Sequence, residues 1–298
     1  MKNKNICVIG GLGFVGRNLT EILDNSNYIT IFDIGDRPKS LLNHIEYVDV
    51  SRNNLNKLKN CYYDFIFYLV GNSSVGNSVS NPILDLEKNT IHLLNFLEII
   101  KNNHSKLIFA SSAACYGEMK NSITANNDEP ISPYGITKLY SEKYLKYYHK
   151  HYGLQILICR FFSLFGKYNQ KQVIYDTTLR LLNYPSKLTI FNPKSRRDFI
   201  YVDEAIEAML FLCNQNKFNA EVFDIGMGKS LSIFELTETI QNFLNIYPLI
   251  KTIKTNFTGD PEVQIANINK LKRLGFNFRT STLYNLRKTV DWIVRITK

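Results

Sequence analysis

Residues 6–16 of the chain read Ile6-Cys7-Val8-Ile9-Gly10-Gly11-Leu12-Gly13-Phe14-Val15-Gly16. A continuous apolar run, typical of a buried strand, leads into glycines at every third position, and a helix-like segment follows. Glycines let the backbone turn tightly and approach a pyrophosphate, and the start of the next helix offers free N–H groups and the positive end of its dipole. The stretch therefore predicts a dinucleotide site formed by Gly10, Gly13, Phe14, Val15 and Gly16.

An acidic residue at the end of the second predicted strand indicates which dinucleotide binds. Asp33 stands 17 residues after Gly16, where a carboxylate accepts hydrogen bonds from the adenosine ribose hydroxyls and repels a 2′-phosphate. No arginine follows Asp33 directly, and Arg37 comes four residues later. We therefore expect NAD rather than NADP. After the third predicted strand, Asp49 and Val50 stand where an acidic and an apolar side chain hold the adenine.

Strand-like and helix-like segments alternate through the first half of the chain. Strands are expected at 6–9, 28–32, 45–48, 65–70, 107–110 and 155–160, and helices at about 14–24, 82–101 and 134–152. Such alternation, with continuous apolar strands, predicts an α/β fold built on a Rossmann-type doubly wound parallel sheet. Later, shorter strands and the helices 203–214, 233–244 and 283–296 indicate a smaller C-terminal α/β domain. We expect an NAD-binding Rossmann domain at 1–165 and a substrate domain at 166–298, with part of 198–226 returning to the Rossmann sheet.

The composition narrows the class of protein. Of 298 residues, 45% are hydrophobic and 21% are charged, and no apolar run approaches the ~20 residues of a membrane span. The start of the chain has no signal-peptide pattern, so we expect a cytoplasmic protein without a membrane partner. The formal net charge of +10 suits phosphates, but the lysines are spread along the chain, which argues against nucleic acid. Five scattered cysteines without a Cys-x-x-Cys pair indicate neither disulfides nor a metal site.

A tyrosine and a lysine lie one helical turn apart in Tyr134-Gly-Ile-Thr-Lys138. A phenol has an ordinary pKa of about 10, and a lysine cation beside an oxidised nicotinamide would stabilise its phenolate. Tyr134 would then exchange a proton with a substrate hydroxyl. The same spacing recurs in the chain, but Tyr134 is singled out by its place at a helix start after Ser132-Pro133. Ser112 ends the preceding strand, where ligands bind in such sheets, so we expect it to share this proton network.

Together these segments resemble the extended short-chain dehydrogenases/reductases and, within them, the NAD-dependent nucleotide-sugar epimerase/dehydratase family. The resemblance rests on the glycine pattern, on Asp33, and on Ser111-Ser-Ala-Ala-Cys-Tyr-Gly117 and Ser132-Pro-Tyr-x-x-x-Lys138. It continues through Arg160-Phe-Phe-Ser-Leu-Phe-Gly166, Arg197-Asp-Phe-Ile-Tyr-Val-Asp203 and Phe223-Asp-Ile-Gly226. It therefore covers essentially the whole chain.

This resemblance implies a role for each matching residue. Tyr134 is the acid/base, Lys138 holds the nicotinamide ribose and lowers the pKa of the tyrosine, and Ser112 is the third catalytic residue. The C-terminal domain binds a nucleotide-diphosphate sugar, and Arg197 meets its diphosphate. The family also implies a homodimer and work in polysaccharide biosynthesis. A tyrosine stripe would form the dimer interface or pack within the subunit: Tyr140, Tyr144, Tyr147 and Tyr148.

Two residues after Ser112 limit the reaction. Family members that are 4,6-dehydratases carry an Asp-Glu pair there, and related decarboxylases keep the glutamate, whereas this chain has Ala113 and Ala114. Dehydration and decarboxylation are therefore disfavoured. What remains is 4-epimerisation by transient oxidation at C4, 4-dehydrogenation, or NAD(P)H-dependent reduction of a 4-keto sugar. The NAD-type Asp33 favours the epimerase, because a dedicated reductase often draws on NADPH. A non-catalytic NAD-sensing regulator would not need the three catalytic residues together.

Other departures from the family leave the substrate open. Ser163 stands where the family has asparagine in Arg-x-Phe-Asn, and Phe257-Thr258-Gly259-Asp260 replaces Arg-Pro-Gly-Asp, so an expected diphosphate arginine is absent. Lys194, Arg196 and Arg197 are candidates to compensate, since arginine binds phosphate in a bidentate manner. Ser73 and Ser74 follow the fourth strand and are candidates to contact the hexose. Uridine, thymidine, guanosine and cytidine sugars all fit these observations.

Overall fold

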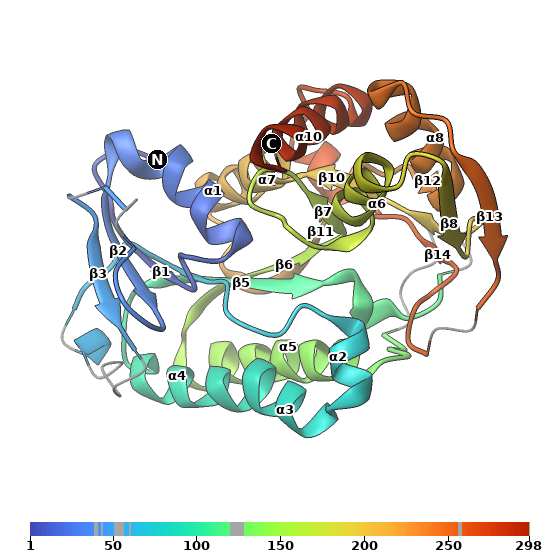
Figure 1. The fold of residues 1–298 in the computed structure, drawn as a ribbon. Coiled ribbons are helices and arrows are strands. Elements are labelled where there is room, and N and C mark those ends of the chain that lie inside the picture. Colours follow the sequence, from blue (N-terminus) through green and yellow to red (C-terminus); the bar gives the residue numbers. More distant parts are fainter. Residues whose placement is uncertain are drawn as a thin grey trace.

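The computed structural model describes residues 1–38, 41–42, 44–50, 57–59, 61–119, 128–255 and 258–297. Its central element is a seven-stranded sheet in which every pairing is parallel (Figure 1). The strand order is β11-β6-β5-β4-β1-β2-β3, with β1 (Asn5–Ile9), β2 (Tyr28–Asp33), β3 (Glu46–Asp49), β4 (Phe65–Tyr68), β5 (Lys106–Ser112), β6 (Gln155–Phe161) and β11 (Asn219–Ile225). The order reverses between β1 and β4, which is the switch point of a doubly wound sheet. The predicted Rossmann-type fold is confirmed.

The side chains of β1 alternate between two separate cores. Ile6 and Val8 belong to the core on one face of the sheet, and Cys7 and Ile9 to the core on the other. Successive residues of a strand point to opposite faces, so a strand buried on both faces is apolar throughout. The first core is covered by α1 (Phe14–Leu23), α7 (Val202–Asn214) and α10 (Thr282–Thr297), and the second by α4 (His92–Ile100) and α5 (Pro133–Tyr152) (Figure 1).

Helix α5 has well-defined ends. The Ser132 hydroxyl accepts a 3.1 Å hydrogen bond from the Gly135 N–H, Pro133 opens the first turn, and Gly153 ends the helix in the left-handed conformation with φ 72°. These signals place Tyr134 in the first turn, next to the carboxyl edge of the sheet. The helix predicted at 82–101 is instead interrupted: α3 (Pro82–Leu86) and α4 are joined by one π-helical turn, Glu87–Ile91, and a short α2 (Val75–Ser80) precedes them.

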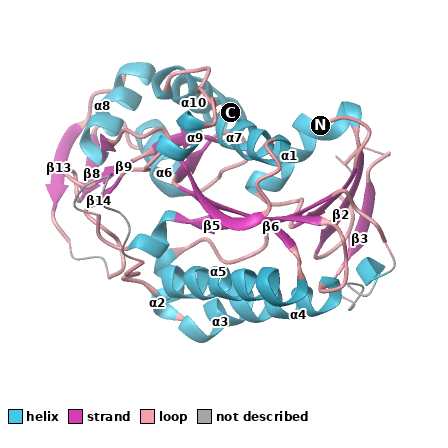
Figure 2. Ribbon diagram, turned by 180° about the vertical axis from the view of Figure 1, so that it is seen from behind, coloured by secondary structure: helices cyan, strands magenta, loops and turns pink. Residues whose placement is uncertain are grey.

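The C-terminal elements form small sheets and helices beside the carboxyl ends of the central strands (Figure 2). The pairs are β7–β10, β8–β13 and the three-stranded set β12-β9-β14. Their bounds are β7 (Ser163–Phe165), β8 (Lys187–Phe191), β9 (Arg196–Arg197), β10 (Phe199–Tyr201), β12 (Leu231–Ser232), β13 (Leu249–Ile253) and β14 (Val263–Gln264), with α6 (Gln172–Asn183), α8 (Ile233–Leu244) and α9 (Asn269–Arg273). Among the described residues, no helix is long and apolar enough to cross a membrane.

Candidate active site

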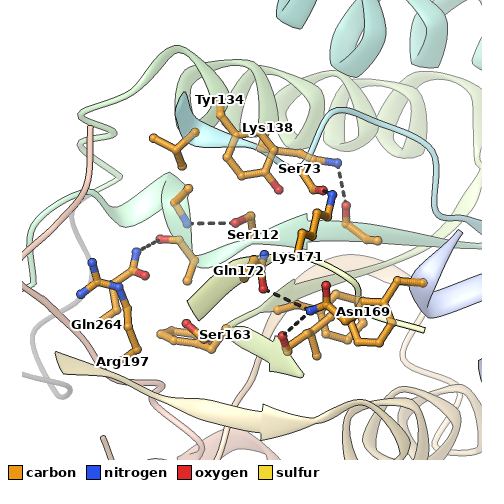
Figure 3. A pocket seen from close by; sticks show the side chains of 18 of the residues that line it. Ser73, Ser112, Tyr134, Lys138, Ser163, Asn169, Lys171, Gln172, Arg197 and Gln264 are labelled. Atoms are coloured by element: carbon orange, nitrogen blue, oxygen red, sulfur yellow. Dashed lines mark hydrogen bonds between the residues drawn. The ribbon is translucent and has the colours of Figure 1, made fainter. Parts of the chain in front are cut away.

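A cavity of about 640 Å³ lies between the carboxyl edge of the central sheet and the C-terminal elements (Figure 3). It brings together most of the residues predicted from the sequence to form the site. Those lining it are Gly10, Gly13, Phe14, Val15, Gly16, Ser73, Ser112, Tyr134, Lys138, Ser163 and Arg197. Segments far apart in the chain thus meet at one site, as expected where a doubly wound sheet binds its ligand.

Two glycines of the turn, Gly10 and Gly16, occupy positions that disfavour a side chain. Gly10 has φ +83°, and a Cβ on Gly16 would lie 2.4 Å from the carbonyl oxygen of Gly10. Helix α1 begins at this turn with Gly13 as its N-cap, without a capping side chain and without an acidic residue in its first turn. The start of the helix therefore presents free N–H groups and the positive end of its dipole to the site. The glycine backbone also lets a pyrophosphate approach closely. These features fit a bound dinucleotide.

Asp33 is tied to the glycine turn by its carboxylate. One oxygen accepts a 2.8 Å hydrogen bond from the Leu12 N–H, and the other accepts a 2.8 Å bond from the Ile34 N–H. The Val50 N–H donates to the Asp33 carbonyl at 2.8 Å, and Asp49 accepts from the Gly35 N–H at 3.1 Å. The three predicted residues at the adenosine end thus lie together at the ends of β2 and β3, next to the turn.

Tyr134, Ser112 and Lys138 form one group beside the glycine turn (Figure 3). Burial raises the pKa of Tyr134 to about 12, and a hydrogen bond with the Ser112 hydroxyl opposes this rise. Burial lowers the pKa of Lys138 to about 8, opposed by nearby Cys115, Asp85 and Glu142. Because the Lys138 ammonium donates a 2.9 Å hydrogen bond to the Ala110 carbonyl, it is held in place at the end of β5.

A buried polar network behind Lys138 was not predicted from the sequence. The Asp85 carboxylate accepts hydrogen bonds from Thr137 at 2.7 Å, Asn72 at 2.7 Å and Asn89 at 3.0 Å. The Asn89 Oδ1 atom is buried and accepts no hydrogen bond from the described residues. A Cβ on Gly71 would lie 2.3 Å from this oxygen and 3.3 Å from the Lys138 Nζ. A side chain at position 71 would therefore collide with Asn89 and crowd the lysine.

A second buried network fixes the strand that carries Ser112. The Arg160 guanidinium is paired with Glu142 at 2.6 Å and with Asp128 at 2.7 Å, and both Arg160 and Glu142 are buried. The Ser111 hydroxyl donates a 2.5 Å hydrogen bond to Glu142. Removing one partner of a buried ion pair is strongly destabilising, because the other charge is left buried and unpaired. The network therefore links β5, β6 and α5 around the site.

Basic residues are distributed unevenly on the substrate side of the cavity. Arg197 lines the cavity and is paired with Asp260 at 2.6 Å. Arg196 is paired with Glu235 at 3.1 Å, and Lys194 is exposed outside the cavity lining, so Arg197 is the better placed of the three candidates. Phe257 lies outside the described residues.

The serines of the loop after β4 differ in their partners. Ser74 caps α2 by accepting a 3.2 Å hydrogen bond from the Asn77 N–H. Ser73 accepts a 2.8 Å hydrogen bond from Lys171, a lining residue that was not predicted. Gln264 is a further unpredicted lining residue, and its amide donates to the Ala113 carbonyl at 3.4 Å.

Comparison with known proteins decides the family. A model described as the NAD dependent epimerase/dehydratase family matches residues 6–226. The chain belongs to this family. The prediction of an NAD-dependent enzyme of this type is confirmed by that membership.

Relatives of the epimerase/dehydratase family match over nearly the whole chain. A putative UDP-glucose 4-epimerase from Methanocaldococcus jannaschii is 28% identical, over 97% of this chain and 98% of the relative. A solved structure of the UDP-N-acetylglucosamine 4-epimerase from Methanobrevibacter ruminantium M1, in complex with UDP-N-acetylmuramic acid, is 31% identical, with a TM-score of 0.86 over 99% of this chain and 100% of the other. The UDP-glucose 4-epimerase of Thermotoga maritima, solved with UDP-glucose, is 27% identical, with a TM-score of 0.86 over 99% and 100%.

The two positions after Ser112 are occupied by alanines. In this chain Ala113 and Ala114 form a short helical turn directly after β5, and both line the cavity. Neither side chain carries a proton. The titratable residues among the described lining residues are Tyr134, Lys138, Lys171, Arg197 and Asp260.

Proposed function

We infer that the chain is an NAD-dependent nucleotide-sugar 4-epimerase, and we propose a UDP-sugar as its substrate. The observation that carries this conclusion is the meeting of Ser112, Tyr134 and Lys138 beside the glycine turn in one cavity, without a proton-bearing side chain at 113 and 114. The two solved structures named above are of UDP-sugar 4-epimerases, and the relative from Methanocaldococcus jannaschii is described as a putative one; all three match the chain over almost its full length.

Residues of the chain would transfer one proton between the C4 hydroxyl of the sugar and Tyr134. The C4 hydroxyl of the sugar lies against Tyr134 and Ser112, and Tyr134 accepts its proton as the carbon is oxidised. Bound NAD would supply reversible hydride acceptance at C4. The oxidised sugar would turn in the cavity, and Tyr134 would then give the proton back. The pKa of Tyr134 is raised to about 12, mainly by burial. We propose that the Lys138 ammonium, as a nearby cation, favours the phenolate during the reaction.

The remaining assignments are proposals that rest on the family resemblance and on the cavity lining, from which Asp33, Asp49, Val50 and Ser74 are absent. We propose that Gly10, Gly13, Phe14, Val15 and Gly16 hold the NAD pyrophosphate, Asp33 the adenosine ribose, Asp49 and Val50 the adenine, and Lys138 the nicotinamide ribose. On the sugar side we propose Ser73, Ser74, Ser112, Tyr134 and Ser163, with Arg197 at the diphosphate. We also propose that residues 1–165 form the NAD-binding domain, which contributes side chains to the sugar site as well, and that 166–298 form the substrate domain with Arg197, with β11 belonging to the Rossmann sheet.

We also propose a homodimer built on the outer face of α5. Tyr140, Tyr144 and Tyr147 are exposed on this helix, and Ile136 extends the same face, whereas Tyr148 is buried and bonded to Glu98. An exposed apolar stripe on a long helix is typical of a subunit interface. We propose that the enzyme works in the cytoplasm, where NAD and nucleotide sugars are supplied, in polysaccharide synthesis and with no nucleic-acid partner.

The test is to incubate the protein with UDP-hexoses, UDP-N-acetylhexosamines and UDP-hexuronates while following product and NADH together. An epimerase converts one of these sugars to its C4 epimer with no net NADH. NADH accumulating in step with product would indicate a dehydrogenase, and consumption of NAD(P)H would indicate a 4-keto-sugar reductase. Full activity in Tyr134→Phe would contradict the assignment of the acid/base.

A further inference from the structure

We infer that Lys171 is a binding residue for a diphosphate in the cavity, an assignment that rests on the proposed function. Two diphosphates belong to the filled site, one in NAD and one in the sugar nucleotide. The lysine comes from the C-terminal elements, just before α6, and it lines the cavity.

Lys171 reaches across the cavity to the central sheet. Its Nζ donates a 2.8 Å hydrogen bond to the Ser73 hydroxyl, in the loop after β4 (Figure 3). Strand β4 lies next to β1 at the switch point of the sheet. Because ligands of doubly wound sheets bind at this point, the ammonium group lies over the place where a dinucleotide and its substrate meet.

The segment that carries Lys171 is anchored on α1, the helix that begins at the glycine turn. The Asn18 amide donates to the Lys167 carbonyl at 2.9 Å, and the Lys167 ammonium is 3.0 Å from Glu21. The Arg17 guanidinium lies 5.5 Å from the ring centroid of Tyr168. These contacts hold the segment beside the start of α1, so Lys171 is presented to the cavity from a fixed position.

The basic side chains of the cavity differ in their partners. Among the described residues lining it, the basic side chains are Lys138, Lys171 and Arg197. Lys138 is bonded to the Ala110 carbonyl deep in the catalytic group, and Arg197 is paired with Asp260. Within the described part of the chain, Lys171 forms no ion pair, and its serine partner is neutral. A phosphate oxygen carries a negative charge that the Ser73 hydroxyl lacks, so a diphosphate would replace Ser73 as the partner of the ammonium.

A neighbouring side chain independently points to a ligand at this segment. The Asn169 Oδ1 atom is buried in the lining of the same cavity and accepts no hydrogen bond from the described residues, although its Nδ2 donates to the Leu164 carbonyl and to Gln172. The Asn169 side chain is only 6% exposed, and buried acceptors are almost always paired. A ribose or sugar hydroxyl next to a phosphate would supply the missing donor.

The experiment measures binding of two probes, UDP by calorimetry and NADH by fluorescence, to four proteins. These are the unaltered chain, Lys171→Met, Lys171→Arg and the control Lys187→Met, which alters an exposed lysine of β8 outside the cavity lining. Loss of one charge-assisted contact should weaken the affected probe roughly ten- to thirty-fold in Lys171→Met. Lys171→Arg should retain most of the affinity, and Lys187→Met should match the unaltered chain.

The pattern of loss identifies the source of the diphosphate. Weaker UDP binding alone assigns Lys171 to the sugar nucleotide, and weaker NADH binding alone assigns it to the dinucleotide. Unchanged affinity for both probes in a folded Lys171→Met protein would overturn the inference. An equal loss in Lys187→Met would do the same, since it would indicate a general effect of charge. Failure of the unaltered chain to bind either probe would contradict the proposed function and, with it, this assignment.

Discussion

Replacing Lys138 with methionine should raise the stability of the protein while lowering its activity. Lys138 is 4% exposed, and burial lowers its pKa from the ordinary 10.5 to about 8. Such a fall corresponds to a destabilisation of about 3 kcal/mol at neutral pH, because one pKa unit is about 1.4 kcal/mol. Methionine is similar in length and apolar, so it removes this cost. It also removes the hydrogen bond to the Ala110 carbonyl, worth about 1 kcal/mol. We therefore expect the free energy of unfolding of Lys138→Met to exceed that of the unaltered chain by about 2 kcal/mol at pH 7.

The same substitution has a defined pH dependence. In the unfolded chain the lysine keeps its proton up to about pH 10.5, whereas in the folded chain it loses the proton near pH 8. Between these values the unfolded state binds more protons, so the unaltered protein gains stability as the pH rises. The advantage of Lys138→Met is therefore complete below pH 8 and shrinks toward pH 10.5. Activity should fall by roughly 100- to 10,000-fold, because the acid/base loses its cationic neighbour.

Urea unfolding at pH 7 and pH 10, together with epimerase assays at pH 7, checks these expectations. Lys143→Met is the control, since Lys143 is exposed on the same helix and its loss should change stability by less than about 0.5 kcal/mol. A Lys138→Met protein less stable than the unaltered chain at pH 7, or a difference that stays the same at both pH values, would refute the reasoning.

Three further predictions concern the cofactor cradle, the core and the proposed interface. Gly16→Ala places a Cβ 2.4 Å from the Gly10 carbonyl oxygen and should weaken NAD binding by about tenfold or more, about 1.4 kcal/mol; equal NADH titrations for the two proteins would show that the turn does not hold the pyrophosphate. Leu93→Ala empties a fully buried site and should lower the free energy of unfolding by about 2–5 kcal/mol in urea titrations; a change below about 1 kcal/mol would mean that the second core is not packed as described. Tyr144→Glu with Tyr147→Glu puts two charges on the outer face of α5 and should convert a dimer to monomers in light scattering; an unchanged mass would place the interface elsewhere.

The fold was predictable because its main signals are local. The apolar run at 6–9 reflects a strand buried on both faces. The glycine spacing reflects a turn in which position 16 has no room for a Cβ atom. Ser132-Pro133 and Gly153 mark the ends of α5, and the Tyr134–Lys138 spacing then places both side chains on its inner face. Each of these features depends on neighbours in sequence, and the confirmed fold and family follow from them.

The features that were missed depend on contacts between distant segments. The π-helical turn at Glu87–Ile91 interrupts the helix predicted at 82–101, and it carries Asn89, whose side chain lies against Gly71. Lys171 is one lysine among many in the sequence, and only the packing of its segment on α1 brings it to Ser73. The division of the chain at residue 165 and the individual site roles stay predictions.

The fate of the hydrogen on C4 tests the central claim most directly. The protein would be incubated with UDP-hexoses, UDP-N-acetylhexosamines and UDP-hexuronates that carry deuterium at C4, and the products would be analysed by NMR and mass spectrometry. Transient oxidation with return of the same hydride predicts a C4 epimer that keeps the deuterium, with no net NADH. Product that carries solvent hydrogen at C4, or deuterium that accumulates in free NADH, would contradict the account.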